Sequence, residues 1–290
     1  MSLPPLALID NWFDTTVLHP SFTLANPDAD DNAGQEAFRA ADNLRDMTEW
    51  SPAAANAIRK LRLTRDSNAT PNILVLDRGT QNVLGGHTFR LQSSTDGFAT
   101  VTTDEVVVTM PTTVGGLPSD ANGCVTNEGA WWKTFTISNS RASWQLSVDA
   151  MGAGLAPIIT GLYLGVAYRL PAYAFLDDGT GPDYARNITY TKNAMSRGGV
   201  RVKMKPRSHR ALITKFPLEN ADYPAFEAVI TNQLEYNHPM WFCLDESDAA
   251  EAGLVGLWQL PNDTLYDPQW IGVHREIVLT WEEVIPKVRM

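Results

Sequence analysis

Hydrophobic and polar residues alternate with a period of two in much of the chain from Ala57 onward. Leu61 and Leu63 alternate with polar neighbours in this way, and Gly-Gly, Asp-Gly and Asn-Gly dipeptides separate the successive runs. The runs include HTFRLQ, EVVVT, WKTFTIS, ASWQLSV and IITGLYLGVAY, the last ending near Tyr168. Because short β-branched runs between such turns form antiparallel hairpins, this part of the chain predicts a β-sandwich or barrel.

A stretch rich in proline, glycine and aspartate, Leu170–Pro182, disfavours regular structure and marks a domain boundary. Strand-like runs resume after it. Apolar residues then recur at three- and four-residue steps over residues 220–236, which predicts an amphipathic helix with Asp222 as its N-cap. We expect a mainly β protein, with an antiparallel β-sandwich and N-terminal arm in residues 1–170 and a smaller β domain with one helix in residues 171–290.

The formal charge of −10, from 23 basic and 33 acidic residues, favours solubility and argues against general nucleic-acid binding. No apolar run approaches the ~20 residues that span a bilayer, and the N-terminus lacks the basic start and long apolar stretch of a signal peptide. The sequence therefore predicts a protein made in a cytoplasm, with neither membrane insertion nor a nucleic-acid partner.

No motif for catalysis or cofactor binding is readable, since the chain has neither a glycine-rich phosphate loop, nor a G-x-S-x-G turn, nor a ligand-spaced histidine pair. The acidic segment Asn26–Asn32 spaces its residues as a calcium loop does, but Ala33 and Arg39 stand where that loop needs glycine and glutamate. We therefore expect no enzymatic activity, no metal and no cofactor. Carboxylates from distant strands can still form a glycosidase site, so a glycan hydrolase stays as an alternative.

The two cysteines, Cys124 and Cys243, are far apart in sequence and match no metal-binding spacing. No structural zinc is predicted. Two interpretations are open: two small buried hydrophobic residues, or a disulfide that joins the two domains.

Adjacent tryptophans, Trp131 and Trp132, stand in one of the predicted strands. Neighbouring residues of a strand point to opposite faces, so one indole is expected in the core and the other at the surface. The outer indole is a candidate surface aromatic contact, which either stacks on a sugar or anchors a protein interface.

Every Lys, Arg, Asp or Glu residue from Arg186 to Lys215 is basic, whereas acids predominate from Phe216 to Pro286. One interpretation is a solvated strand face neutralised by acids of the same domain. The other is a head-to-tail contact between copies, which closes into a ring when the rotation allows it. The candidate assembly interface consists of Arg201, Lys203, Lys205 and Arg207.

Residues Ala41–Trp50 read ADNLRDMTEW, and the later segment QSSTDGF contains Ser94, Asp96 and Gly97. These segments resemble the A-x-N-L-x-D…T-x-W stretch and the Ser-x-Asp-Gly element of galactose-binding-like (discoidin-like) β-sandwiches. The resemblance covers roughly residues 40–170. It implies a galactose-binding-like fold for the first domain, with Trp50 buried in its core.

The second half arranges its motifs in the order of a Gly-Gly-x-R strand, an F-P-L strand, an amphipathic helix, a P-x-W-F strand and a terminal W-E-E-V strand. The corresponding segments are Gly198–Met204, Phe216–Leu218, residues 220–236, Pro239–Phe242 and Trp281–Val284. This order is similar to that of tail-tube-like and distal-tail-like domains in siphophage-type tailed bacteriophages, which build rings.

Taken together, the resemblances imply a structural component of a bacteriophage virion, a minor tail protein of the tail tip or baseplate. Such a protein assembles in the host cytoplasm as a homo-oligomeric ring with other tail and baseplate proteins. The alternative is a carbohydrate-binding module or adhesin that recognises a host glycan. Galactose-binding-like domains often bind glycans, although no sugar-binding residue pattern is transferable to this chain.

Overall fold

A computed structural model of the chain describes residues 6–15, 19–25, 57–77, 85–126, 130–152, 159, 161–169, 183–189, 194–195, 201–202, 207–221, 223–236, 240–243, 245–249, 256–260, 269–271 and 274–283. The chain divides into two compact units. The first is Met1–Arg169 with Phe242–Val255 and Pro286–Met290, and the second is Leu170–Trp241 with Gly256–Ile285. The first and longest stretch of the first unit ends at Arg169, one residue before the expected position 170. The unit also includes two later segments of the chain that were expected in the second domain.

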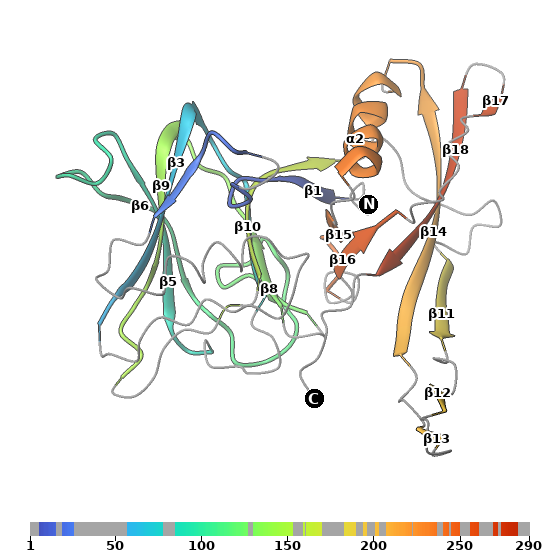
Figure 1. The fold of residues 1–290 in the computed structure, drawn as a ribbon. Coiled ribbons are helices and arrows are strands. Elements are labelled where there is room, and N and C mark those ends of the chain that lie inside the picture. The colour runs from blue at the N-terminus through green and yellow to red at the C-terminus, as the bar shows by residue number, and fades with distance from the viewer. Residues whose placement is uncertain are drawn as a thin grey trace. The chain divides into compact units, whose positions relative to one another are not determined.

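The first unit contains a five-stranded antiparallel sheet in the order β2-β3-β9-β5-β6 (Figure 1). Its strands are β2 (Thr23–Ala25), β3 (Arg59–Ala69), β9 (Arg141–Val148), β5 (Thr88–Ser94) and β6 (Thr103–Thr109). Buried residues alternate with more exposed ones in β3, as its period of two predicts. One face of this sheet is therefore apolar and the other is polar.

A second antiparallel sheet in the first unit runs in the order β1-β10-β4-β8-β7. Its strands are β1 (Leu6–Asn11), β10 (Gly161–Arg169), β4 (Ile73–Asp77), β8 (Trp131–Thr134) and β7 (Cys124–Val125). Ile73 to Leu76 are all buried, so β4 is covered on both faces and its sequence is continuously apolar rather than alternating.

The core of the first unit is one hydrophobic cluster drawn from both sheets. The five-stranded sheet contributes Leu61, Leu63, Phe89, Leu91, Trp144 and Leu146, and the other sheet contributes Leu74, Leu76, Trp131, Leu162 and Leu164. Trp144 is fully buried, and its indole nitrogen donates to the Arg141 carbonyl at 3.0 Å. The expected antiparallel β-sandwich is confirmed.

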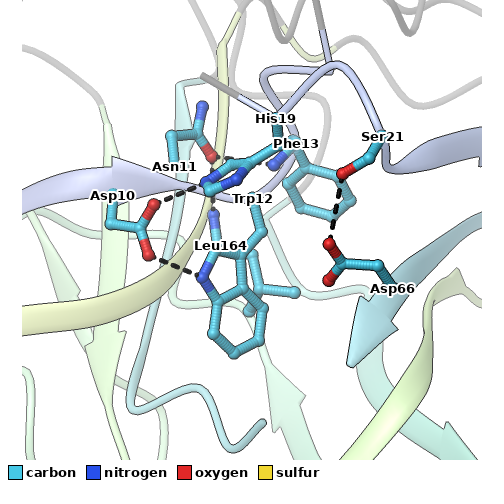
Figure 2. A network of polar contacts seen from close by, with 8 residues as sticks. All are labelled: Asp10, Asn11, Trp12, Phe13, His19, Ser21, Asp66 and Leu164. Carbon is cyan, nitrogen blue, oxygen red and sulfur yellow. Dashed lines mark hydrogen bonds and ion pairs between the residues drawn. The ribbon is translucent and has the colours of Figure 1, made fainter. Parts of the chain in front are cut away.

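The N-terminal segment joins the two sheets, because β1 pairs with β10 and β2 pairs with β3. Asn11 fixes the crossing (Figure 2): its buried amide donates to the Leu162 carbonyl at 3.0 Å and accepts from the backbone nitrogens of Leu164 and Phe13 at 3.1 and 3.2 Å. The backbone nitrogen of Trp12 also donates to the Leu164 carbonyl at 2.7 Å. A buried amide that makes all these hydrogen bonds stabilises the fold, whereas a buried amide without partners would lower the free energy of unfolding by about 1–3 kcal/mol.

A closed set of stacked side chains surrounds the same crossing. The Arg65 guanidinium lies 3.7 Å from the centroid of the Trp12 ring and 4.9 Å from that of Phe22, whose ring stacks on His19 at 4.3 Å. Asp10 closes the set, since it accepts from the Trp12 indole at 3.1 Å and meets His19 Nε2 at 2.5 Å (Figure 2). Burial raises the pKa of Asp10, but the hydrogen bonds from His19 and Trp12 together with the charges of His19 and Arg65 outweigh burial and leave this pKa lowered. The fold therefore favours the ionised form of the Asp10 carboxylate.

The second unit is also antiparallel, with the strand order β11-β14-β18-β16 and β17 paired to β18. Its strands are β11 (Asp183–Thr189), β14 (Arg207–Glu219), β18 (His274–Glu283), β16 (Gly256–Gln259) and β17 (Gln269–Ile271), with a separate pair formed by β12 (Ala194–Met195) and β13 (Arg201–Val202). β15 (Met240–Cys243) spans the division between the units along the chain.

Helix α2 (Tyr223–Tyr236) lies within the predicted range 220–236. Phe226 and Ile230, four residues apart, are buried, as the three- and four-residue spacing predicts. Asp222, the expected N-cap, lies outside the described residues. The prediction of a β-rich second part with one helix is therefore confirmed for the part of the chain that the structure describes.

We expect Trp144→Ala to lower the free energy of unfolding of the first unit by about 3–5 kcal/mol, because it removes a fully buried indole from the centre of the core. Chemical denaturation followed by circular dichroism measures the change. Val166→Ala, at an exposed position of β10, is the control and should change it by no more than about 0.5 kcal/mol. Equal effects of the two substitutions would contradict the assigned core.

Candidate functional site

The two tryptophans predicted as a surface contact are both fully buried, so neither offers a face at the surface of this chain. Trp131 belongs to the core, and its indole donates to the Asn122 carbonyl at 2.8 Å. Trp132 faces the other side of the sheet, where its register partner Val75 is fully buried as well. The expectation of an outward indole is wrong, because β8 is covered on both faces rather than on one.

The predicted basic assembly face falls largely outside the described residues. The structure describes the backbone of Arg201 in β13 and of Arg207 in β14, but no side chain of this face, and Lys203 and Lys205 are not described. The ADNLRDMTEW segment with Trp50 and the acidic segment Asn26–Asn32 also lie outside the described residues. The assembly interface therefore remains a prediction.

The cysteines follow the first of their two interpretations, because Cys124 and Cys243 form no disulfide and are both buried. Burial raises the pKa of the Cys124 thiol to about 11 and that of Cys243 well above its usual value. Both are therefore small apolar core residues rather than nucleophiles or a disulfide. Among the described residues, no group of three or more His, Cys, Asp or Glu side chains could hold a metal ion, and no helix is long and apolar enough to cross a membrane.

The polar face of the five-stranded sheet carries a continuous row of hydrogen-bonded side chains, here called the polar ladder: Arg62, Gln145, Gln92 and Asp104. These residues are direct cross-strand partners on β3, β9, β5 and β6. Arg62 Nε donates to Gln145 at 2.8 Å, Gln145 donates to Gln92 at 2.6 Å, and Gln92 donates to Asp104 at 2.6 Å. Each side chain of the ladder thus holds the planar group of the next one in a fixed orientation.

The ladder lies opposite the core because strand neighbours alternate between faces. Leu61, Leu63, Trp144 and Leu91 flank its members along the strands and all point into the hydrophobic cluster. Asp104 reaches the same row through an irregularity in β6, where Leu91 pairs with Val106 but Gln92 pairs with Asp104. The extra residue of such a bulge turns a side chain to the opposite face.

A second arginine, Arg90, lies on the adjacent position of this face between two carboxylates. It pairs with Asp149 and lies 3.8 Å from Asp104. The hydrogen bond to Asp149 raises the pKa of Arg90. Its charge is therefore matched inside the protein, and it also offsets the charge at the Asp104 end of the ladder.

The loop after β5 places an aromatic ring at the other end of the ladder. Ser94 Oγ accepts from the backbone nitrogens of Asp96 and Phe98 at 3.2 and 2.8 Å. Gly97 and Phe98 both have positive φ, 68° and 67°. For a bulky residue such as Phe98 this conformation is strained, so the loop contacts must hold it in place.

Asp96 is the anchor of this loop. Its carboxylate accepts from Thr100 Oγ1 at 2.6 Å, from Ser94 Oγ at 2.8 Å, and from the backbone nitrogens of Thr100 and Val101 at 2.8 and 3.1 Å. These hydrogen bonds, with that from the Thr100 side chain the strongest, lower the pKa of Asp96 far below its usual range. The Ser-x-Asp-Gly element noted in the sequence is therefore a capped turn in the structure.

Phe98 and the ladder meet at Arg62, whose guanidinium carbon lies 5.1 Å from the centroid of the half-buried Phe98 ring. The resulting surface, here called the binding face, consists of Phe98 and the polar ladder. It combines one aromatic ring with a guanidinium, two amides and a carboxylate in fixed order. Sequence reasoning found its loop through Ser94 and Asp96 but missed the ladder, because the pairing of β9 with both β3 and β5 cannot be read from alternation alone.

Comparison with known proteins gives no match to a family model and none to a curated protein. Among solved structures, the chain is similar to a GH29 fucosidase of Ruminococcus gnavus in complex with fucose (8% identity, TM-score 0.41), covering 56% of this chain and 28% of that one. It is also similar to CpGH89CBM32-5 from Clostridium perfringens in complex with GalNAc-β-1,3-galactose (14%, TM-score 0.36; 50% and 94% covered). A third is chitosan-binding module 1 of a chitosanase/glucanase from Paenibacillus sp. IK-5 (16%, TM-score 0.33; 50% and 92% covered).

These neighbours include carbohydrate-binding modules of glycoside hydrolases. None of the three is a tail or baseplate protein, so the expected virion role has no support from them. Similarities at this level do not place the chain in any of these families.

We expect Asp96→Asn to destabilise the first unit at neutral pH. The substitution replaces one carboxylate oxygen, which accepts hydrogen bonds, by an amide NH₂ group, which only donates them. The difference from the wild type should begin to shrink as the pH falls below about 4 and should go on shrinking at lower pH. The extra stability from a carboxylate with a lowered folded-state pKa is complete above its unfolded pKa and is lost as the pH falls through its folded pKa. Denaturation curves at several pH values measure it. Thr100→Val, which keeps the carboxylate and the backbone donors, should have a smaller effect; a larger one would contradict the role of Asp96 as anchor.

Proposed function

We propose that the first unit is a non-catalytic carbohydrate-binding module and that the binding face, Phe98 with the polar ladder, is its glycan site. The observation that carries the proposal is the junction of a strained, half-buried aromatic ring with an ordered row of planar hydrogen-bonding groups. This combination matches the chemistry of a sugar ring, which presents an apolar C–H face and a rim of hydroxyls.

The ladder offers both kinds of hydrogen-bonding partner that a hydroxyl needs. The Arg62 guanidinium donates, the Gln92 amide donates and accepts, and the Asp104 carboxylate accepts. The buried Gln145 amide holds Arg62 and Gln92 in position. Successive strands lie ~4.8 Å apart, so the row repeats at a spacing close to the width of one sugar ring. A short oligosaccharide laid across the strands would therefore meet Arg62 on β3, Gln92 on β5 and Asp104 on β6.

Preorganisation favours binding at this face. Each ladder side chain is held by its neighbour, and Phe98 is held by the Ser94 and Asp96 contacts. Side chains that are ordered before binding lose little entropy when the ligand arrives, a saving of about 0.5–1.5 kcal/mol for each. The strain at Phe98 has no evident benefit for folding, and strained residues cluster where function requires a fixed position.

The test is Phe98→Gly, assayed by a glycan array and by calorimetry on the glycan that the full chain binds. Glycine adopts positive φ freely, so relief of strain should offset the lost ring contact and stability should change by less than about 1 kcal/mol. Loss of the stacking ring should weaken binding by roughly tenfold. Phe98→Trp should retain binding, and Val166→Ala is the matched surface control.

A chain that binds no glycan on a broad array, or a Phe98→Gly protein that binds as tightly as the wild type, would refute this site. Binding lost together with folding in Phe98→Gly would leave Phe98→Trp as the deciding variant, because it keeps an aromatic ring at the same position.

As a second candidate we keep the role of a minor tail protein in a bacteriophage virion. One specific observation favours it: residues 207–283 have the element order β14, α2, β15 and β18. These elements are the F-P-L strand, helix, W-F strand and terminal W-E-E strand on which the resemblance to ring-building tail domains rests. The two functions are compatible, since a tail protein can carry a glycan-binding unit.

Mass spectrometry of purified phage particles tests the second candidate. We expect peptides of this chain in the particles, and we expect that Arg201→Glu, Lys203→Glu and Lys205→Glu combined would prevent incorporation while the protein still folds. Normal incorporation of the triple variant would rule out the basic face as the contact. Absence of the chain from particles would rule out the virion role itself.

A further inference from the structure

We infer that the glycan bound at this face carries a carboxylate, as a uronic or sialic acid does, and that Arg62 recognises this group. The inference rests on the proposed glycan-binding function and adds the class of sugar. It follows from the different surroundings of the two arginines on the polar face of the sheet, Arg62 and Arg90.

Arg90 is electrostatically matched within the protein. It is bonded to Asp149 and lies near Asp104. A ligand anion at Arg90 would have to displace a carboxylate that is already in place, and it would meet the negative charge of the second one. Arg90 therefore links side chains of the sheet and is not the arginine that binds a ligand.

Arg62 has no such partner among the described residues. Its Nε donates to the neutral amide of Gln145 at 2.8 Å, and its guanidinium lies over the Phe98 ring at 5.1 Å. No described carboxylate forms an ion pair with it. A guanidinium has five N–H donors, so the contact to Gln145 leaves the terminal nitrogens for a ligand.

The contacts of Arg62 also suit it to a carboxylate in particular. Stacking on an aromatic ring and the bond to Gln145 fix the plane of the guanidinium, and a fixed plane permits two parallel hydrogen bonds to the two oxygens of a carboxylate. Arginine is weakly hydrated, so removing water from this site costs less than it would at a lysine. A sugar that stacks on Phe98 would place a ring substituent beside Arg62.

The charge pattern along the ladder sets the direction of the ligand. Arg62 forms the positive end of the ladder on β3. Asp104 forms the other end on β6, where Arg90 offsets its charge. An acidic sugar is therefore favoured at the β3 end, next to Phe98, and neutral sugars at the β6 end.

The experiment is calorimetry of the full chain with matched pairs of ligands. One pair is a galacturonic acid trisaccharide and its methyl ester, which keeps the shape and removes the charge. The other pair is sialyllactose and lactose. We expect the acidic member of at least one pair to bind roughly tenfold to a hundredfold more tightly than its neutral partner, as for hydrogen bonds between charged groups. The pair that shows the preference distinguishes a uronic acid from a sialic acid.

Three variants locate the effect. Arg62→Gln keeps a donor for Gln145 but removes the charge, so it should abolish the preference by weakening the binding of the acidic ligand much more than that of the neutral one. Arg62→Lys keeps the charge without the two parallel donors and should retain only part of the preference. Arg141→Gln removes an arginine from β9, outside the ladder, and should leave the preference intact.

The outcomes separate this inference from the proposed function. Equal affinities for acidic and neutral ligands would overturn the inference and leave glycan binding standing. An equal loss of preference in Arg62→Gln and Arg141→Gln would also overturn it, because the effect would then reflect overall charge. No binding to any glycan on the array would overturn the proposed function and this inference with it.

Discussion

The register between β3, β9 and β5 is the constraint on which the core and the binding face both depend. Leu63 faces Trp144 across β3 and β9, and the neighbouring pair, Arg62 and Gln145, points to the other side. A shift of one residue would exchange the two faces, placing a guanidinium in the core and an indole in water. The burial of Trp144 therefore also fixes the order of the polar ladder.

The N-terminal segment adds a second restraint of a different kind. It enters one sheet as β1 and the other as β2, and it crosses between them through polar rather than apolar contacts. The Asn11 side chain makes three hydrogen bonds to backbone groups at the crossing, and Asp10 links Trp12 to His19. Such bonds have strict directions, so they specify one path of the chain where apolar packing would accept several.

The proposed site uses the side of the sheet that the core does not need. Phe98, Arg62, Gln92 and Asp104 are exposed or half-buried, and they are ordered by one another, by the buried Gln145 and by the strained turn at Phe98. This order distinguishes the ladder from an ordinary solvated strand face, where long side chains lose entropy on binding. The different surroundings of Arg62 and Arg90 then give the face an uneven charge, which is a basis for selecting among sugars.

The sequence by itself determined the class of the fold, since alternating runs between turn dipeptides specify antiparallel strands and the spacing of Phe226 and Ile230 specifies a helix. It also located the turn at Asp96, because Asp and Gly act locally there. It could not place Trp132, which is buried on the side of the sheet where alternation predicts an exposed indole, next to the buried Ile73 and Val75 of β4. Nor could it reveal the ladder, whose members come from four strands: strand pairing depends on the energy of the packed core, which no short segment contains, so only the tertiary structure decided which polar side chains meet.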